Sequence, residues 1–205
     1  SGCTQVERRA VIESAERANA RERYLVQEPM AAALGIGLDV EQPEGHMIID
    51  IGGGTTEIAV IALSGIVTDQ SLRVAGDDFT YDIIEHVKRQ HNILIGERTA
   101  EQIKIHVGAA IQELDNPPED FPVHGRDLLT GIPKQVIVTY VEIAAALDKS
   151  ISKIEEGIMR ALESTPPELA SDIYQKGLYL TGGGALLRGL DKRISLNTKL
   201  PVKVA

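Results

Sequence analysis

Three apolar runs in the first half of the chain predict neighbouring β-strands. Residues 46–51 and 56–63 are almost continuously apolar, and the four residues between them are Gly52-Gly53-Gly54-Thr55. Ser64-Gly65 then turns the chain into a third run that ends near Ser71. Short apolar runs separated by glycine-rich turns are typical of strands joined in hairpins. The pattern therefore predicts a three-stranded antiparallel meander rather than a βαβ unit.

Other stretches have helical spacing. Three threonines are each followed three residues later by glutamate or glutamine, the sequence form of a capping box, and they are Thr4, Thr99 and Thr139. The helices that they start are predicted to cover 4–20, 99–111 and 139–162. Between 77 and 91, apolar residues recur every three or four positions, which predicts a further amphipathic helix with one buried stripe.

Two junctions between a predicted strand and a predicted helix stand out. Residues 24–27 form a short strand-like run, and Pro29 starts an alanine-rich helix, so Glu28 lies between them. Near the end of the chain, an apolar strand at 178–180 leads through a glycine turn into a predicted helix at 185–194.

The order of these elements predicts an α/β fold, with a mixed sheet flanked by helices on both faces. The meander and the strand at 178–180 are expected in one sheet. Paired strands around Gly131, at 123–130 and 132–138, indicate a small inserted α+β subdomain at about 96–135. The larger subdomain then consists of 41–95 together with 136–205.

Charge and composition exclude several classes of protein. The net charge is −9, the lysines and arginines are dispersed, and aromatic residues make up only 3% of the chain. Neither a basic surface nor a set of stacking aromatics is present, so no nucleic-acid binding is expected. The single cysteine, Cys3, cannot form an internal disulfide, and no apolar run reaches the roughly 18 residues of a membrane span. A soluble, cytoplasmic protein is expected.

The strongest local signal for chemistry is the glycine hairpin after the first strand. Gly52, Gly53 and Gly54 let the backbone approach a ligand closely and adopt positive φ, so successive amides can point at phosphate oxygens. Asp50, at the end of the strand, can hold a hydrated Mg²⁺ ion. The order of strand, aspartate, glycines, threonine and strand favours a phosphate site. The alternative is a tight glycine hairpin with a solvated aspartate.

A second glycine turn, Thr181-Gly182-Gly183-Gly184, lies between a strand and a helix, where a helix N-terminus can receive a ligand. It is not a dinucleotide fingerprint, because Leu187 occupies the third glycine position and no acidic residue follows about 20 positions later. A dehydrogenase is therefore disfavoured. The alternative is close packing of a helix on a strand, although two such turns in one acidic chain are much less expected by chance than one.

Six segments resemble, in order, those of the MreB family of bacterial actins. They are Glu28-Pro29-Met30-Ala31-Ala32-Ala33, the hairpin at 50–57, Ala75-Gly76-Asp77-Asp78, and the stretches 95–104, 126–133 and 180–185. The resemblance covers essentially the whole chain. The glycine turns are shared with actin, sugar kinases and chaperone ATPases, whereas 28–30 and 126–133 look particular to MreB. The resemblance implies an actin-like ATPase fold of the ribonuclease H-like type, with its first half largely missing.

The resemblance also implies binding roles. The second phosphate loop is implied to consist of Gly52, Gly53, Gly54 and Thr55, with Asp50 assisting Mg²⁺. The adenosine of ATP is implied to be flanked by Gly182, Gly183 and Gly184. Its ribose and base edge are implied to bind Glu101 and Lys104. Without the resemblance, Glu101 and Lys104, three apart on one predicted helix, are more simply a surface ion pair.

Glu28 resembles the catalytic glutamate of the family, which orients the water that attacks the γ-phosphate. The alternative is a carboxylate stabilised by the N-terminus of a helix. Compared with a complete member, the chain resembles a C-terminal portion, with 1–40 as a remnant of the first large subdomain. Weak ATPase activity is expected of the full-length protein. No activity is expected of this chain, because the first phosphate loop lies outside the match.

The implied function is that of an ATP- and Mg²⁺-binding cytoskeletal protein that polymerises into filaments and helps to determine rod cell shape. The implied partners are further copies of itself and, through the full-length protein, cell-wall elongation proteins and the inner face of the membrane. Two other classes share the fold. A sugar or acetate kinase should have a catalytic aspartate where this chain has Glu28, and a chaperone ATPase should have a hydrophobic linker and a peptide-binding domain downstream, neither of which is present.

Overall fold

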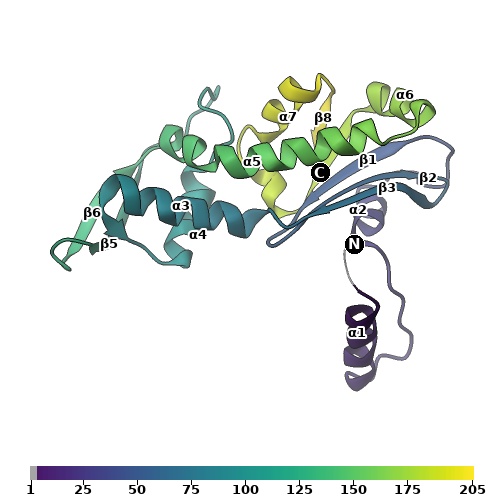
Figure 1. The fold of residues 1–205 in the computed structure, drawn as a ribbon, viewed down its shortest axis with the longest axis horizontal. Helices are drawn as coiled ribbons and strands as arrows, with labels where there is room; N and C mark the ends of the chain where they lie inside the picture. Colours follow the sequence, from purple (N-terminus) through teal and green to yellow (C-terminus); the bar gives the residue numbers. More distant parts are fainter. Residues whose placement is uncertain (1–3) are drawn as a thin grey trace.

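The computed structural model describes residues 4–205. Its largest sheet has five strands in the order β3-β2-β1-β7-β8. These are β1 (His46–Ile51), β2 (Thr56–Ala62), β3 (Gly65–Leu72), β7 (Leu178–Thr181) and β8 (Val202–Val204). β1, β2 and β3 are antiparallel neighbours, whereas β7 and β8 continue the sheet in parallel with β1 (Figure 1). The predicted meander and the predicted strand at 178–180 are confirmed as parts of one mixed sheet.

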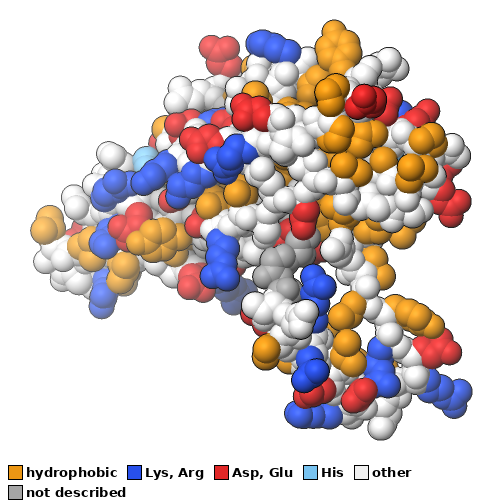
Figure 2. Space-filling view, turned by 45° about the vertical axis from the view of Figure 1, so that its right-hand side comes forward, with side chains coloured by type: hydrophobic (Ala, Val, Ile, Leu, Met, Phe, Trp, Pro, Cys, Tyr) orange, Lys and Arg blue, Asp and Glu red, His pale blue; other side chains and the backbone are white. Residues whose placement is uncertain are grey.

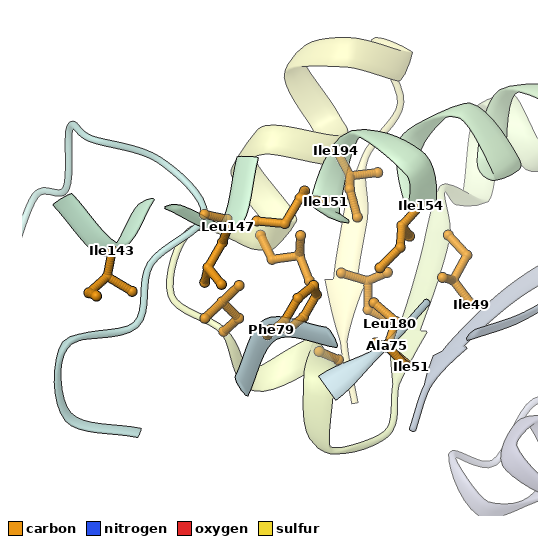
Figure 3. Packing of buried hydrophobic residues seen from close by; sticks show 14 of the residues in the cluster. Ile49, Ile51, Ala75, Phe79, Ile143, Leu147, Ile151, Ile154, Leu180 and Ile194 are labelled. Carbon is orange, nitrogen blue, oxygen red and sulfur yellow. The ribbon is translucent and has the colours of Figure 1, made fainter. Parts of the chain in front are cut away.

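Helices cover both faces of this sheet, as predicted. One face forms the main core with α3 (Gly76–His91), α5 (Tyr140–Glu163), α6 (Pro167–Lys176) and α7 (Leu190–Thr198). Figure 3 shows side chains of α5 and α7 packed over those of β1 and β7. On the other face, Ile48 and Ile61 pack against Ala33 of α2 (Glu28–Gly35). Because both faces are buried, β1 and β2 read as continuous apolar runs.

A second, three-stranded sheet lies beyond the large sheet, at the other end of α3 and α5 (Figure 1). Its strands are β4 (Ile93–Leu94), β5 (Phe121–Asp127) and β6 (Pro133–Val138), and α4 (Glu97–Val107) contacts β5. The hairpin between β5 and β6 is closed by the Asp127 carboxylate, which accepts the amides of Leu129 (2.8 Å) and Thr130 (2.9 Å). The two paired strands predicted around Gly131 are confirmed, the first with bounds shifted toward the N-terminus and the second one residue shorter.

Two of the three predicted capping boxes are present. α1 (Gln5–Arg17) begins after Thr4 and α5 begins after Thr139, and both threonines exchange hydrogen bonds with the glutamate three residues on. The box predicted at Thr99 is wrong. α4 starts earlier, with Gly96 as its N-cap, so the amide of Thr99 already donates to the carbonyl of Gly96 (3.0 Å). The helix then ends at Val107 rather than 111, because Gly108 has extended backbone.

Two other local predictions are also wrong. Residues 24–27 form no strand and are exposed. None of the residues of α1 is buried. Figure 1 shows α1 standing apart from the sheet. The helix predicted at 185–194 is a 3-10 turn at Gly183–Leu186 followed by α7, because Gly189 takes a positive φ of 73° and interrupts the helix.

A polar cluster joins the end of α3 to the start of α5. The Nε2 atoms of His86 and His91 lie 3.1 and 2.8 Å from the same carboxylate oxygen of Glu142, whose other oxygen accepts the amide of Thr139 (2.7 Å). Burial opposes ionisation of Glu142, but the Thr139 amide and the two imidazoles outweigh it and lower the pKa of this carboxyl. The cluster anchors the N-terminus of α5.

Charges of both signs are mixed over the face shown in Figure 2, in agreement with the dispersed lysines and arginines of the sequence. Within residues 4–205, no helix has both the length and the apolar character needed to cross a membrane.

Candidate nucleotide site

A cleft of about 460 Å³ lies where the two glycine turns meet the first turn of α3 and the last turns of α4. Its walls come from segments that are far apart in the sequence. The lining residues are Gly52, Gly53, Gly76, Asp77, Phe79, Glu101, Lys104, Ile105, Gly183, Gly184, Leu186, Leu187 and Arg188. The cleft therefore combines a polar end, at the glycine hairpin and α3, with an apolar end at Ile105 and Leu186. A phosphorylated ligand with an apolar ring fits this division.

The glycine hairpin between β1 and β2 is held by its own backbone and by α3. The amide of Gly52 donates to the carbonyl of Thr55 (2.9 Å), and the amides of Gly76 and Asp77 donate to the carbonyls of Gly52 (3.0 Å) and Gly53 (2.8 Å). The amides of 53–55 have no acceptor within residues 4–205. Three consecutive free amides beside a cleft are the donors that a phosphate group requires.

The backbone of this hairpin differs from the prediction in one respect. None of Gly52, Gly53 and Gly54 has a positive φ. The hairpin turns without left-handed residues, and a Cβ added at Gly53 would be in ordinary contact with the Asp77 carboxylate, 3.4 Å from its nearer oxygen.

The second glycine turn packs directly on the end of β1. Gly182 has a φ of 82°, and a Cβ there would collide with the Asp50 carboxylate and the Ile51 carbonyl. A Cβ at Gly184 would collide with the side chain of Ile51. The two turns are adjacent because β1 and β7 are parallel neighbours with Asp50 in register with Thr181. Close packing therefore accounts for Gly182 and Gly184, whereas Gly183 and Gly184 also line the cleft, where a ligand could approach.

Asp50 lies in a row of buried polar side chains on the α2 face of the sheet. Glu57 is its partner across β2 and Thr181 its partner on β7. Asp50 is 9% exposed and Glu57 is 3% exposed, and Glu57 accepts a hydrogen bond from Ser71 (2.8 Å). Burial raises the pKa of Asp50, and the nearby Glu57 acts in the same direction, while the Thr181 hydroxyl opposes them. A cation would relieve the penalty on the ionised carboxylate.

α4 contributes the charged wall of the cleft. The ammonium of Lys104 contacts the carbonyl of Gly76 (2.9 Å), the hydroxyl of Thr80 (3.0 Å) and the carboxylate of Glu101 (2.6 Å). Burial opposes ionisation of Glu101, but Lys104 and Thr80 outweigh it and lower the pKa of this carboxyl. Lys104 is 16% and Glu101 is 47% exposed, so only the carboxylate resembles a surface group.

The structure brings some of the sequence-predicted residues together and leaves others outside. Those in the cleft lining are Gly52, Gly53, Glu101, Lys104, Gly183 and Gly184. Gly54, Thr55, Gly182 and Asp50 lie in the two turns or the strand end directly beside it. Glu28 is the exposed first residue of α2 and is not among the lining residues.

Three residues of the site were missed from the sequence. Asp77 lines the cleft beside the glycine hairpin, Thr80 bridges Lys104 and Glu101, and Arg188 lines the apolar end. The signals for Asp77 were its place in the first turn of a predicted helix and in a segment that resembles the MreB family, but no role was assigned to it. Thr80 and Arg188 are identified by long-range contacts alone. Within residues 4–205, no cluster of three or more histidine, cysteine or carboxylate side chains could hold a metal ion by itself.

Comparisons with known proteins agree on one family. The model of the MreB/Mbl protein family matches residues 1–205. The cell shape-determining protein MreB of Escherichia coli (strain K12) is 50% identical over 204 residues, which are 100% of this chain and 58% of that protein. The cell shape-determining protein Mbl of Bacillus subtilis (strain 168) is 45% identical over 98% of this chain and 60% of its own length. The chain thus spans about three-fifths of these relatives.

Solved structures agree with this assignment. MreB 5 of Spiroplasma citri bound to AMPPNP superposes with a TM-score of 0.95 at 40% identity, over 100% of this chain and 61% of that one. A MamK double helical filament, with a TM-score of 0.80 and 21% identity over 100% of this chain and 61% of that one, shares the fold. The five-stranded mixed sheet with its helices is thus an actin-like fold, and the chain belongs to the MreB/Mbl family of cell shape-determining actin homologues.

Proposed function

We propose that this chain is the nucleotide-binding part of an ATP-binding protein that polymerises and helps to determine cell shape. The observation that carries the proposal is the cleft between the two glycine turns, with three free amides at 53–55 on one side and Glu101 and Lys104 on the other. MreB 5 of Spiroplasma citri, 40% identical to this chain, has been solved with AMPPNP and with ADP.

In this proposal the hairpin amides and Thr55 bind the phosphates, and the turn at 182–184 lies against the adenosine. Glu101 and Lys104 bind the ribose and the edge of the base. Mg²⁺ in proteins is often held by one or two carboxylates together with substrate phosphates, and Asp50 supplies such a carboxylate beside the hairpin. Bound Mg²⁺ would neutralise phosphate charge. The raised pKa of Asp50, caused mainly by burial, supports a cation there.

We further propose that Glu28 orients the water that attacks the γ-phosphate in the intact protein, and that turnover is weak. Glu28 is the first residue of α2, which packs on the sheet face that also carries Asp50. The division proposed for the chain is a remnant of a first large subdomain at 1–40, a second large subdomain at 41–95 and 136–205, and a small insert at 96–135. In this proposal the chain alone would not turn over ATP.

Self-assembly is proposed as the output of nucleotide binding. The related MamK forms a double helical filament, and its fold is the one found here. The proposed partners are other copies of this protein and, in the intact protein, cell-wall elongation proteins at the inner face of the membrane.

Nucleotide binding to the intact protein, measured by isothermal titration calorimetry with Mg²⁺ and ATP, tests the proposal. Lys104→Ala should weaken ATP binding about tenfold or more, since it removes a charged hydrogen-bond donor from the cleft wall. Lys153→Ala is the matched control, because Lys153 is an exposed lysine of α5 outside the cleft. The proposal fails if the unaltered protein binds no ATP, or if both variants bind it equally well.

A further inference from the structure

Arg188 lies in the loop after the second glycine turn and binds the carbonyl of Ile105 near the end of α4, 83 residues earlier in the sequence. It thereby joins the loop to the helix. We propose that Arg188 is a positioning residue that fixes the separation between the α4 wall and the glycine-turn wall of the cleft, and so sets the affinity for the nucleoside half of the ligand. This inference rests on the proposed nucleotide-binding function.

The contacts of Arg188 are made by both its side chain and its backbone. One guanidinium nitrogen, Nη1, donates to the carbonyl of Ile105 (2.9 Å) and lies 3.4 Å from that of Gly108. The backbone carbonyl of Arg188 accepts the amide of Ala110 (2.8 Å), and Arg188 forms an isolated parallel bridge with Ala109. The last carbonyls of a helix have no partner within the helix, and a guanidinium can satisfy them and interact favourably with the helix dipole.

These contacts join residues that line the cleft. Lys104 and Ile105 belong to the last turn of α4, and Leu186 and Leu187 directly precede Arg188. Arg188 lines the cleft as well, so its bonds lie at the apolar end of the site itself. The residue acts through its neighbours, because it holds Lys104 and the leucines at a fixed separation.

The joint between the two walls has little free space. A Cβ at Gly108 would collide with the carbonyl of Lys104 and would lie 3.0 Å from the side chain of Leu187. Gly189 has a φ of 73°, which closes the loop directly after Arg188. On its outer side the segment is held separately, because Arg193 donates to the carbonyl of Ala110 (3.2 Å) and pairs with Glu155 of α5 (2.9 Å). Arg193 thus anchors the segment to α5 without lining the cleft.

The phosphate side of the cleft is built without Arg188. Its hairpin is held by the Gly52–Thr55 bond and by the bonds from α3, none of which involves the loop at 186–189. A change at Arg188 should therefore alter binding of the nucleoside and leave binding of the phosphates unchanged. A substitution that only destabilised the fold would weaken binding of the nucleoside and of the phosphates alike.

The test measures dissociation constants of the intact protein for ATP, and for inorganic triphosphate by displacement of a fluorescent ATP analogue. Arg188→Ala should weaken ATP binding about tenfold, the effect of losing one charged hydrogen-bond donor, with less than a twofold change for triphosphate. Arg188→Lys keeps the charge but not the planar guanidinium that places Nη1 near both carbonyls, so an intermediate loss is expected. It also serves as the measurable variant if Arg188→Ala does not fold.

Arg160→Ala, an exposed arginine of α5 outside the cleft, is the matched control and should bind both ligands normally. Equal losses for ATP and triphosphate, or normal ATP binding by both Arg188 variants, would overturn the inference. If Lys104→Ala is impaired and the Arg188 variants are not, this inference fails while the proposed function stands. If the unaltered protein binds no ATP, both fail.

Discussion

Gly182 is the position in the site where a single methyl group should do most damage to the fold. It follows β7 with a φ of 82° and a ψ of 166°, a region of backbone conformation that is essentially restricted to glycine. Its missing side chain also makes room for the Asp50 carboxylate and the Ile51 carbonyl at the end of β1. Gly182→Ala therefore combines backbone strain with a steric clash against a buried strand.

The size of the effect follows from these two contributions. A residue held in such a sparsely populated conformation costs about 1–3 kcal/mol. Inserting a methyl group into a packed region costs about 1–3 kcal/mol more, because a backbone carbonyl cannot move aside as a flexible side chain can. The sum, about 2–6 kcal/mol, is a large part of the stability of a typical domain. With a urea m-value of about 2 kcal/mol per molar, the midpoint should fall by about 1–3 M.

The assay is equilibrium urea unfolding of the 205-residue chain, followed by far-UV circular dichroism. Gly183→Ala is the matched control, because an added Cβ at this neighbouring position meets nothing within 4 Å and the φ of Gly183 is not positive. Its stability should change by less than about 0.5 kcal/mol. The reasoning is refuted if Gly182→Ala unfolds at the same urea concentration as the unaltered chain, or if the two variants are equally destabilised.

Two further predictions concern carboxylates with shifted pKa values. Because burial raises the pKa of Asp50, its ionised form is disfavoured in the folded chain. Asp50→Asn should therefore raise the midpoint of urea unfolding at pH 7 and abolish the Mg²⁺ dependence of ATP binding. A lower unfolding midpoint would contradict this prediction. The pKa of Glu142 is lowered from its ordinary 4.5, so the contribution of its carboxylate to folding stability is present above pH 4.5 and is lost as the pH falls through the folded pKa. The unaltered chain should therefore be more stable than Glu142→Gln at neutral pH, and this difference should shrink below pH 4.5. A difference that grows below pH 4.5 would contradict the prediction.

Much of the fold could be predicted because its signals are local. The capping threonines Thr4 and Thr139 and the apolar runs of β1 and β2 each carry their information within a few residues. The errors arose where a neighbour or a distant contact decided the outcome. Gly96 caps α4 before Thr99 can. No strand was predicted for β8, which has only three residues and exists through its pairing with β7.

The candidate site divides in the same way. The glycine turns were visible as local patterns, and the pairing of Glu101 with Lys104 followed from their spacing on a helix. That the two turns meet follows only from the parallel pairing of β1 and β7. Thr80 and Arg188 carry no local pattern, because their roles depend on partners about 20 and 80 residues distant. The roles of Glu28 and Asp50 in catalysis and metal binding stay predictions.

The ladder between β1 and β7 also limits how this site can change. Neighbouring strands lie about 4.8 Å apart, and the position of one glycine turn relative to the other is set by backbone hydrogen bonds, with Asp50 opposite Thr181. A substitution that fits the space at the turns can alter what they bind without changing the distance between β1 and β7. A shift of one residue in the pairing would turn every side chain of β7 to the opposite face and remove Leu178 and Leu180 from the main core. The spacing of the two turns is therefore fixed by the packing of the core, whereas the side chains between the turns can change.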